Sequence, residues 1–451
     1  MRAKQWISLS LMGLMTMGCK ATDNYALIEG TPSYEEKAAT NVLRIGAWVA
    51  PPSANWNGKG NPDFNTEERF QEVADSGINI IYSLYQHTNR AETIRAAKNA
   101  TAVGIKYLAR DIALNIDPIK METEPGELHA QTQGYDGEES FEGFLVRDEP
   151  SANDFASIAN LHEFYKNEYP GKEFYINLFP TYASTSQTGT TDYKEYIDRY
   201  IEQVKPSFIS YDHYALHVDG YGNYKITPDV LWNLEIVAER CKAAGIPMYT
   251  FVSDMSYGST SREPNREELR WQVLTQLVYG SRSIQYFCYW TPLEFAEGSP
   301  SMITVDGKKT DHYYDVQAVN QELSGLDEAY LDYSWQSTMT IYGSANQAKS
   351  NKQFSMLEHP SESLEGLKDI SASQDSLIGY FQNDEGREAY MIMNFDDPHH
   401  GNKDEIQLTF RGANKVLIYH YGIAERLTLN GGVLKYTLDP GDGIFAIPYK
   451  E

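Results

Sequence analysis

The sequence predicts an α/β domain followed by an all-β domain. Between residues 44 and 330, short apolar segments alternate with amphipathic segments, and this strand–helix unit recurs eight times. Eight such units within about 290 residues are the number and size of a (β/α)8 TIM barrel. Past Trp335 the pattern changes to short alternating segments separated by turn-forming residues. We therefore expect a TIM barrel over residues 41–334 and an antiparallel β-sandwich over residues 335–451.

The barrel prediction depends on segment order. The predicted strands are residues 44–51, 79–87, 105–114, 141–147, 173–180, 207–216, 247–255 and 283–291. The predicted helices are residues 64–76, 90–103, 151–169, 192–204, 228–244, 265–279 and 315–330, and residues 115–140 are predicted to form a long loop with one short helix, which brings the number of predicted helices to eight. Strands that are apolar at nearly every position suit a parallel sheet that is buried on both faces. The alternative, an open doubly wound sheet, needs a glycine-rich phosphate turn after the first strand, where this chain has Ala50-Pro-Pro-Ser53.

The predicted sandwich consists of segments that begin at Thr338, Leu377, Ala389, Glu405, Lys415 and Gly443. Turn sequences such as Asn-Asp-Glu-Gly and Leu-Asn-Gly-Gly separate them. The segment Leu438-Asp-Pro-Gly-Asp-Gly-Ile-Phe445 resembles the closing strand of accessory sandwiches that follow bacterial glycosidase barrels.

The first 40 residues predict export. Arg2 and Lys4 precede an apolar run that is too short for a lasting membrane span. The run ends in Thr-Met-Gly-Cys19, which resembles the lipobox of bacterial lipoproteins, where the cysteine is acylated. This resemblance implies a signal peptide over residues 1–19, lipidation of Cys19, a tether over residues 20–40 and anchoring in the outer membrane, on its periplasmic or surface face. The alternative is a plain secretory signal with an incidental cysteine.

Composition and charge argue against several partners and cofactors. The net charge of −25 disfavours nucleic acid and anionic membrane surfaces, because both select basic proteins. The 33 tyrosines suit polar ligands, because each combines an apolar ring with a hydroxyl. Cys241 and Cys288 fall in a predicted helix and a predicted core strand, so we expect buried thiols and no disulfide framework. Amidohydrolase-type metal barrels place paired histidines after the first strand, and this chain has none there, so we expect no metal and no cofactor.

Catalytic groups of TIM barrels lie at the C-terminal ends of the strands. The predicted strand ends supply carboxylates, an amide, an arginine, a histidine and aromatic rings. These candidates are Trp48, Tyr85, Arg147, Asp148, Glu149, Asn177, Asp212, His213, Tyr214, Asp254 and Trp290. Aromatic faces stack on the apolar faces of sugar rings, whereas carboxylates and amides bind hydroxyl groups. The combination predicts a carbohydrate ligand.

Two segments resemble known sugar-cleaving barrels. Phe144-Leu-Val-Arg-Asp-Glu-Pro150 resembles the strand-four motif of retaining (β/α)8 glycosidases, most of which have Asn-Glu-Pro. Residues 269–290 resemble the helix–strand pair of β-galactosidase-like barrels of the family 42 type. Together with the lipobox and the sandwich, this implies a Bacteroidetes-type lipoprotein glycoside hydrolase acting on a β-linked glycan. By the resemblance, Glu149 is the general acid/base, and Asp148 stands where the family has the asparagine that binds the sugar 2-hydroxyl.

The second carboxylate is the open question. The family places a glutamate at the end of strand seven, where this chain has Asp254; Asp212 and Glu294 are the alternatives. His213 could instead be a structural histidine, and Trp48 and Trp290 could belong to the barrel core. Two other functions stay open: a non-catalytic glycan-binding lipoprotein on the same barrel, and a structural surface protein.

Overall fold

The computed structural model describes residues 42–110 and 134–450, apart from residues 57, 59, 85, 88, 136, 257 and 259. The predicted signal peptide, Cys19 and the tether lie outside the described residues. So do Tyr85 and most of the predicted 115–140 loop. Cys241 and Cys288 are described, and both are buried free thiols as expected.

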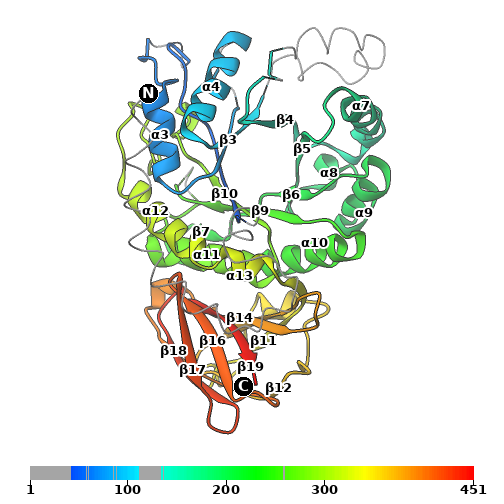
Figure 1. The fold of residues 1–451 in the computed structure, drawn as a ribbon, viewed down its shortest axis with the longest axis vertical. Coiled ribbons are helices and arrows are strands. Elements are labelled where there is room, and N and C mark those ends of the chain that lie inside the picture. Colours follow the sequence, from blue (N-terminus) through cyan, green and yellow to red (C-terminus); the bar gives the residue numbers. More distant parts are fainter. Residues whose placement is uncertain are drawn as a thin grey trace.

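A closed parallel barrel forms the first domain, which confirms the predicted fold class (Figure 1). Neighbouring strands around the described barrel are β1 (Arg44–Trp48), β10 (Ser283–Phe287), β9 (Met248–Ser253), β6 (Ile209–Tyr211), β5 (Glu173–Leu178), β4 (Phe141–Asp148), β3 (Lys106–Ala109) and β2 (Ile80–Tyr82). Several strands are shorter than predicted. The chain leaves the ladder early and forms loops at the rim, so that β2 and β6 cover only the N-terminal part of the predicted 79–87 and 207–216 segments.

Helices surround the barrel (Figure 1). They are α3 (Glu67–Asp75), α4 (Arg90–Val103), α7 (Phe155–Glu168), α9 (Tyr193–Val204), α10 (Val230–Ala244), α11 (Arg266–Val278) and α12 (Asp311–Ser324), with the shorter α8 (Thr185–Thr188) and α13 (Asp327–Leu331). Gly104 and Gly245 end α4 and α10 in the left-handed conformation, with φ of 78° and 69°. None of the helices within the described ranges is both long and apolar enough to cross a bilayer.

The interior of the barrel is partly polar, and its hydrogen bonds show which side chains point inward. The Tyr175 hydroxyl donates to Gln285 and lies 2.6 Å from the Ser210 hydroxyl, so three different strands meet at the barrel axis. Trp48 joins this interior layer, packing 5.1 Å from Phe251 ring to ring. Because strand side chains alternate between faces, these residues show which positions of their strands point into the barrel and which point outward.

The second domain is an antiparallel sandwich of two sheets, as predicted. One sheet has the order β11 (Ser334–Ile341), β13 (Ser376–Gln382), β14 (Glu388–Asn394), β19 (Gly443–Tyr449), β16 (Lys415–His420) and β17 (Ile423–Thr428). The other consists of β12 (Leu367–Ser371), β15 (Asp404–Phe410) and β18 (Val433–Leu438). The sequence pattern did not reveal β12, β17 and β18, because most of their residues are not fully buried and their apolar alternation is weak.

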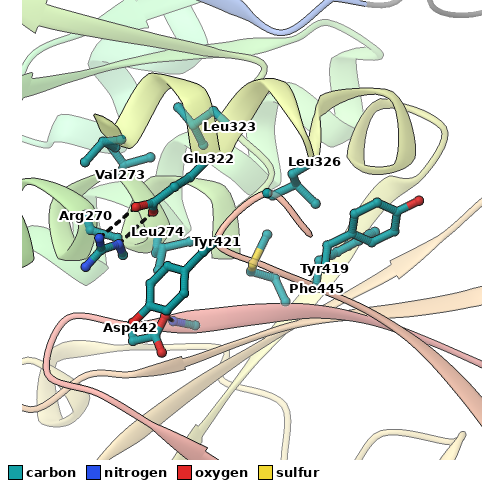
Figure 2. A pocket seen from close by; sticks show the side chains of 14 residues that line it. Arg270, Val273, Leu274, Glu322, Leu323, Leu326, Tyr419, Tyr421, Asp442 and Phe445 are labelled. Carbon is teal, nitrogen blue, oxygen red and sulfur yellow. Dashed lines mark hydrogen bonds and ion pairs between the residues drawn. The ribbon is translucent and has the colours of Figure 1, made fainter. Parts of the chain in front are cut away.

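The sandwich packs on one side of the barrel, where α11 lies against β13 and β14 (Figure 1). A cavity of about 30 Å³ at this seam is lined by side chains of α11, α12 and the sandwich (Figure 2). Arg270 and Glu322 form a two-point ion pair beside it, with nitrogen–oxygen distances of 2.7 Å. A space of this size holds no more than a few water molecules, so the two domains are closely packed at this point.

Candidate active site

A bulge in β4 sets the orientation of its final residues. Leu145 lies opposite Tyr175 in β5, but the register then shifts, and Asp148 lies opposite Asn177. Tyr175 and Asn177 both face the barrel interior, so the extra residue brings Asp148 to the inner face as well. Arg147 lies opposite Ile176, which puts it on the outer face, where it is exposed. Arg147 is therefore not among the residues that the structure gathers at the mouth of the barrel.

Glu149 follows at once in a left-handed backbone conformation, with φ of 48°. Such a conformation is uncommon for a residue with a side chain and is typical of functional sites. The Glu149 backbone N–H donates to the Asn177 carbonyl at 2.8 Å, which fixes the turn onto the end of β5. Glu149 therefore stays at the rim of the barrel, where it is partly exposed, and does not become part of the helix that follows.

Asn177 connects the acids of two strands. Its side-chain amide donates to Asp212 at 2.8 Å and lies 3.3 Å from Asp148. The Ser210 hydroxyl donates to the amide oxygen of Asn177 at 2.9 Å, which fixes which end of the amide faces the acids. Asp148, Asn177 and Asp212, which end β4, β5 and β6 or follow them directly, therefore form one polar cluster.

The pKa values of Glu149 and of the two acids in this cluster are raised. Burial, and then the charges of Asp212 and Asp148, raise the pKa of Glu149 to about 8. Burial and the charge of Asp148 raise the pKa of Asp212 to about 7, against hydrogen bonds from Asn177 and Tyr214. Burial also raises the pKa of Asp148, although its side chain is accessible to solvent, as expected for a group in a concave surface. Near neutral pH the Glu149 carboxyl is therefore protonated, and Asp212 is the first of these two acids to ionise.

His213 and its neighbours form the adjoining part of the rim. His213 is buried, and its Nδ1 lies 2.9 Å from the Asn233 side-chain oxygen, while its Nε2 lies 3.7 Å from Asp229. Burial lowers the pKa of His213, so the ring is neutral at physiological pH. These contacts support the structural alternative for His213, which holds the rim in place. Tyr214 is partly exposed and packs 5.9 Å from the Phe287 ring, so it lies at the mouth beside Asp212.

Asp254 is not brought to Glu149, and its predicted place on the rim is wrong. The residue is fully buried, and one carboxylate oxygen accepts the Met302 N–H at 3.2 Å. Phe251 points into the barrel, so alternation turns Asp254 outward, beneath the segment that follows β10. Burial raises its pKa well above the usual range, so the carboxyl is neutral. The other alternative, Glu294, is exposed in a short 3-10 helix, Leu293–Phe295.

The two predicted tryptophans also lie in the core. Trp290 is fully buried and packs 4.6 Å from Phe64, outside the barrel strands, so its predicted rim position is wrong. Trp290 follows the end of β10 and packs beside the start of α3, where the Arg69 guanidinium lies 6.0 Å from its ring. Trp48 is 3% exposed and belongs to the interior layer beneath the mouth, so it too does not provide an exposed face.

With this geometry in view, comparison with solved structures is informative about the fold. An Anoxybacillus α-amylase is 9% identical, and the match covers 91% of this chain and 98% of that one at a TM-score of 0.51. A β-galactosidase from Marinomonas ef1 is 9% identical over 64% of this chain and 60% of that one, with a TM-score of 0.46. An α-L-arabinofuranosidase from Thermotoga maritima is 9% identical over 91% and 97%, with a TM-score of 0.44.

The chain shares the fold of that α-amylase. The barrel implied by the resemblance to glycosidases is therefore present. This chain spans only 60% of the length of the Marinomonas β-galactosidase. A scan against models of protein families and a search of curated proteins gave no match. In the ranges that the structure describes, no group of three or more His, Cys, Asp or Glu side chains is arranged to hold a metal ion.

Sequence reasoning missed one prominent residue of this rim. Tyr182 follows β5 in the turn that begins at Pro180, and it is 54% exposed. Its ring packs edge-on against His213, 5.0 Å away. The sequence does show an aromatic residue just after the fifth predicted strand. Pro180 separates it from the apolar part of that strand, however, and the functional residue predicted for the strand is Asn177.

Proposed function

We propose that this protein is a glycoside hydrolase that cleaves a β-linked glycan or oligosaccharide, with Glu149 as general acid/base and Asp212 as the second carboxylate. One observation carries the proposal: two electrostatically coupled acids, one protonated and one that ionises first, stand at the ends of β4 and β6. Two carboxyl groups whose environments separate their proton affinities are what glycosidic bond cleavage requires.

The chemistry follows from the two protonation states. Glu149 donates its proton to the glycosidic oxygen as the bond to the anomeric carbon breaks. The positive charge that develops on the sugar ring is stabilised by ionised Asp212, which either bonds to the anomeric carbon or takes a proton from the attacking water. If Asp212 bonds to the anomeric carbon, ionised Glu149 then takes a proton from a water molecule whose oxygen attacks that carbon and displaces Asp212, so both acids return to their starting states. If Asp212 instead takes the proton of the attacking water, it releases that proton to solvent, and Glu149 regains its own proton from solvent. Proton NMR of the first anomer released distinguishes the two roles of Asp212, since direct attack retains the configuration and water activation inverts it.

The location of the enzyme is part of the proposal. Lipidation of Cys19 anchors it in the outer membrane, which gives the barrel access to extracellular or periplasmic glycans. Growth with labelled fatty acid tests this anchor: the label is incorporated into the wild-type protein, and the Cys19→Ala variant incorporates none. Equal labelling of the two proteins contradicts it.

The deciding experiment replaces the proton donor. The Glu149→Gln variant is expected to lose about a hundredfold or more in kcat on β-linked polysaccharides, because their alcohol leaving groups need a proton that an amide does not donate. Its melting temperature and its retention in polysaccharide affinity gels stay at the wild-type level. Glu294→Gln is the matched control, since Glu294 is exposed and stands outside the acid cluster. Full activity in the Glu149→Gln variant refutes the assignment.

A glycan-binding protein without catalysis is the second candidate, and the burial of Asp254 favours it. The family position for a nucleophile, after the seventh strand of the barrel, offers no accessible acid. A wild-type protein that is retarded in polysaccharide gels but cleaves none of the substrates identifies this function.

A further inference from the structure

We propose that Tyr182 is the surface on which a sugar ring of the substrate stacks, beside Glu149 and Asp212. This inference rests on the proposed function and specifies where its substrate lies. Of the aromatic residues predicted to bind sugar, Trp48 and Trp290 are in the core, Tyr85 lies outside the described residues, and Tyr214 is only partly exposed at the mouth. Tyr182 presents a further aromatic face at the rim, and this side chain is 54% exposed.

The position of Tyr182 relative to the acids is the first argument. Charges on Asp212, Glu149 and Asp229 all act on its hydroxyl, so the ring lies within electrostatic reach of both proposed catalytic groups. Together with burial they raise its pKa, and the hydroxyl keeps its proton. A protonated hydroxyl at this point donates a hydrogen bond to a sugar oxygen while the ring covers an apolar sugar face.

The rigidity of Tyr182 is the second argument. The preceding residue, Thr181, donates its backbone N–H to Asn233 at 2.9 Å and its hydroxyl to Asp229 at 2.6 Å. Asn233 is fully buried and also bonds His213, whose ring supports the Tyr182 ring edge-on. The turn is closed by the Ala183 N–H, which donates to Pro180 at 3.1 Å. An exposed aromatic that is held from below by buried polar groups binds with little loss of side-chain entropy.

The chain supplies a matched control in Tyr221. This residue is 94% exposed in the turn between β7 (Leu216–Val218) and β8 (Tyr224–Ile226). Its backbone N–H donates to Asp219, and no ring contact with the acid cluster is present among the described side chains. Removing its ring tests whether loss of any surface tyrosine near the barrel has the same effect.

The test compares Tyr182→Ala, Tyr182→Phe and Tyr221→Ala in the full chain, on whichever 4-nitrophenyl glycosides or β-linked oligosaccharides the wild type cleaves. The Tyr182→Ala variant is expected to lose about tenfold in kcat/KM, mainly through a higher KM, because a stacked ring is removed. The Tyr182→Phe variant keeps the ring but lacks the hydroxyl that donates to the sugar, so it is expected to lose only about threefold. The Tyr221→Ala variant is unchanged, and all melting temperatures agree.

Several results overturn the proposal. Wild-type kinetics in the Tyr182→Ala variant do so, and so does an equal loss in the Tyr221→Ala variant. If the wild type cleaves nothing, the proposed catalysis fails, and affinity gels containing galactan, xylan or mannan decide the inference separately. Loss of gel retardation in Tyr182→Ala alone supports the stacking surface, whereas unchanged retardation, or no retardation of the wild type, refutes it.

Discussion

Asp212 and Asp254 follow neighbouring strands of the barrel, β6 and β9, yet they lie in opposite environments. Asp212 has the phase of Ser210, which faces the barrel axis, and so it joins Glu149 and Asp148 at the mouth. Asp254 has the opposite phase to Phe251, and it is buried outside the barrel wall. The comparison teaches that an acid at a strand end is a catalytic candidate only when the alternation of its strand points it inward.

Exchanging the two acids for amides tests this difference most strongly. The Asp212→Asn variant is expected to lose about a thousandfold in kcat, because the carboxylate that acts on the anomeric carbon or on the attacking water is then missing. The Asp254→Asn variant replaces a neutral acid by a neutral amide and keeps activity within about threefold of wild type. Initial rates on the same glycoside, together with melting curves, measure both. A large loss of kcat in a well-folded Asp254→Asn variant reverses the comparison.

The chain after β9 also anchors the sandwich domain. Buried Arg262 binds Asp397 of the sandwich at 2.8 and 3.0 Å and Glu268 of α11 at 2.6 Å. The Arg262→Met variant is expected to reduce the free energy of unfolding by about 3 kcal/mol, because two buried carboxylates lose their counter-charge. The matched control is Arg266→Met, whose partner Asp315 is on the surface, and it costs less than about 1 kcal/mol. Urea unfolding compares them, and equal costs contradict the role of Arg262.

The dependence of activity on pH tests the role of Asp212, the acid that follows β6. Asp212 must be ionised, so kcat/KM rises with pH through about 7, and Glu149 must be protonated, so kcat/KM falls above about 8. The Asp148→Asn variant removes a negative charge that raises both pKa values, and both limbs of the profile are expected to move to lower pH. The same profile measured for Glu294→Gln stays in place. A shift to higher pH in Asp148→Asn refutes the coupling.

The sequence was sufficient for the architecture because each strand and helix carries its own local signal. Glycines such as Gly104 and Gly245 marked helix ends, and the change of pattern past Trp335 marked the sandwich. It was sufficient for Glu149 and Asn177 because they directly end apolar strands. It failed for Asp254 and Trp290. Asp254 directly follows β9 and turns outward by its alternation, whereas Trp290 lies in the segment after β10, where strand alternation no longer sets the direction of a side chain.

Only the resemblance to glycosidases implied that Asp148 turns inward. The residue types do not predict this direction, because a bulge in β4 changes the strand phase and leaves no clear mark in them. The same holds for Tyr182. Its place beside the acids depends on how Thr181 binds Asn233, and this contact spans two separate parts of the chain.

The amide of Asn177 has a consequence for residues that never meet the substrate. Its oxygen accepts a hydrogen bond from the Ser210 hydroxyl, and this hydroxyl in turn contacts Tyr175 and Gln285 at the barrel axis. The orientation of these deep groups determines which way the amide points, and the amide in turn lowers the pKa of Asp212. Substitutions deep in the barrel can therefore change the pKa of Asp212 at the mouth. Gln285 is a position at which the optimum pH of the enzyme is open to change without any contact with the ligand.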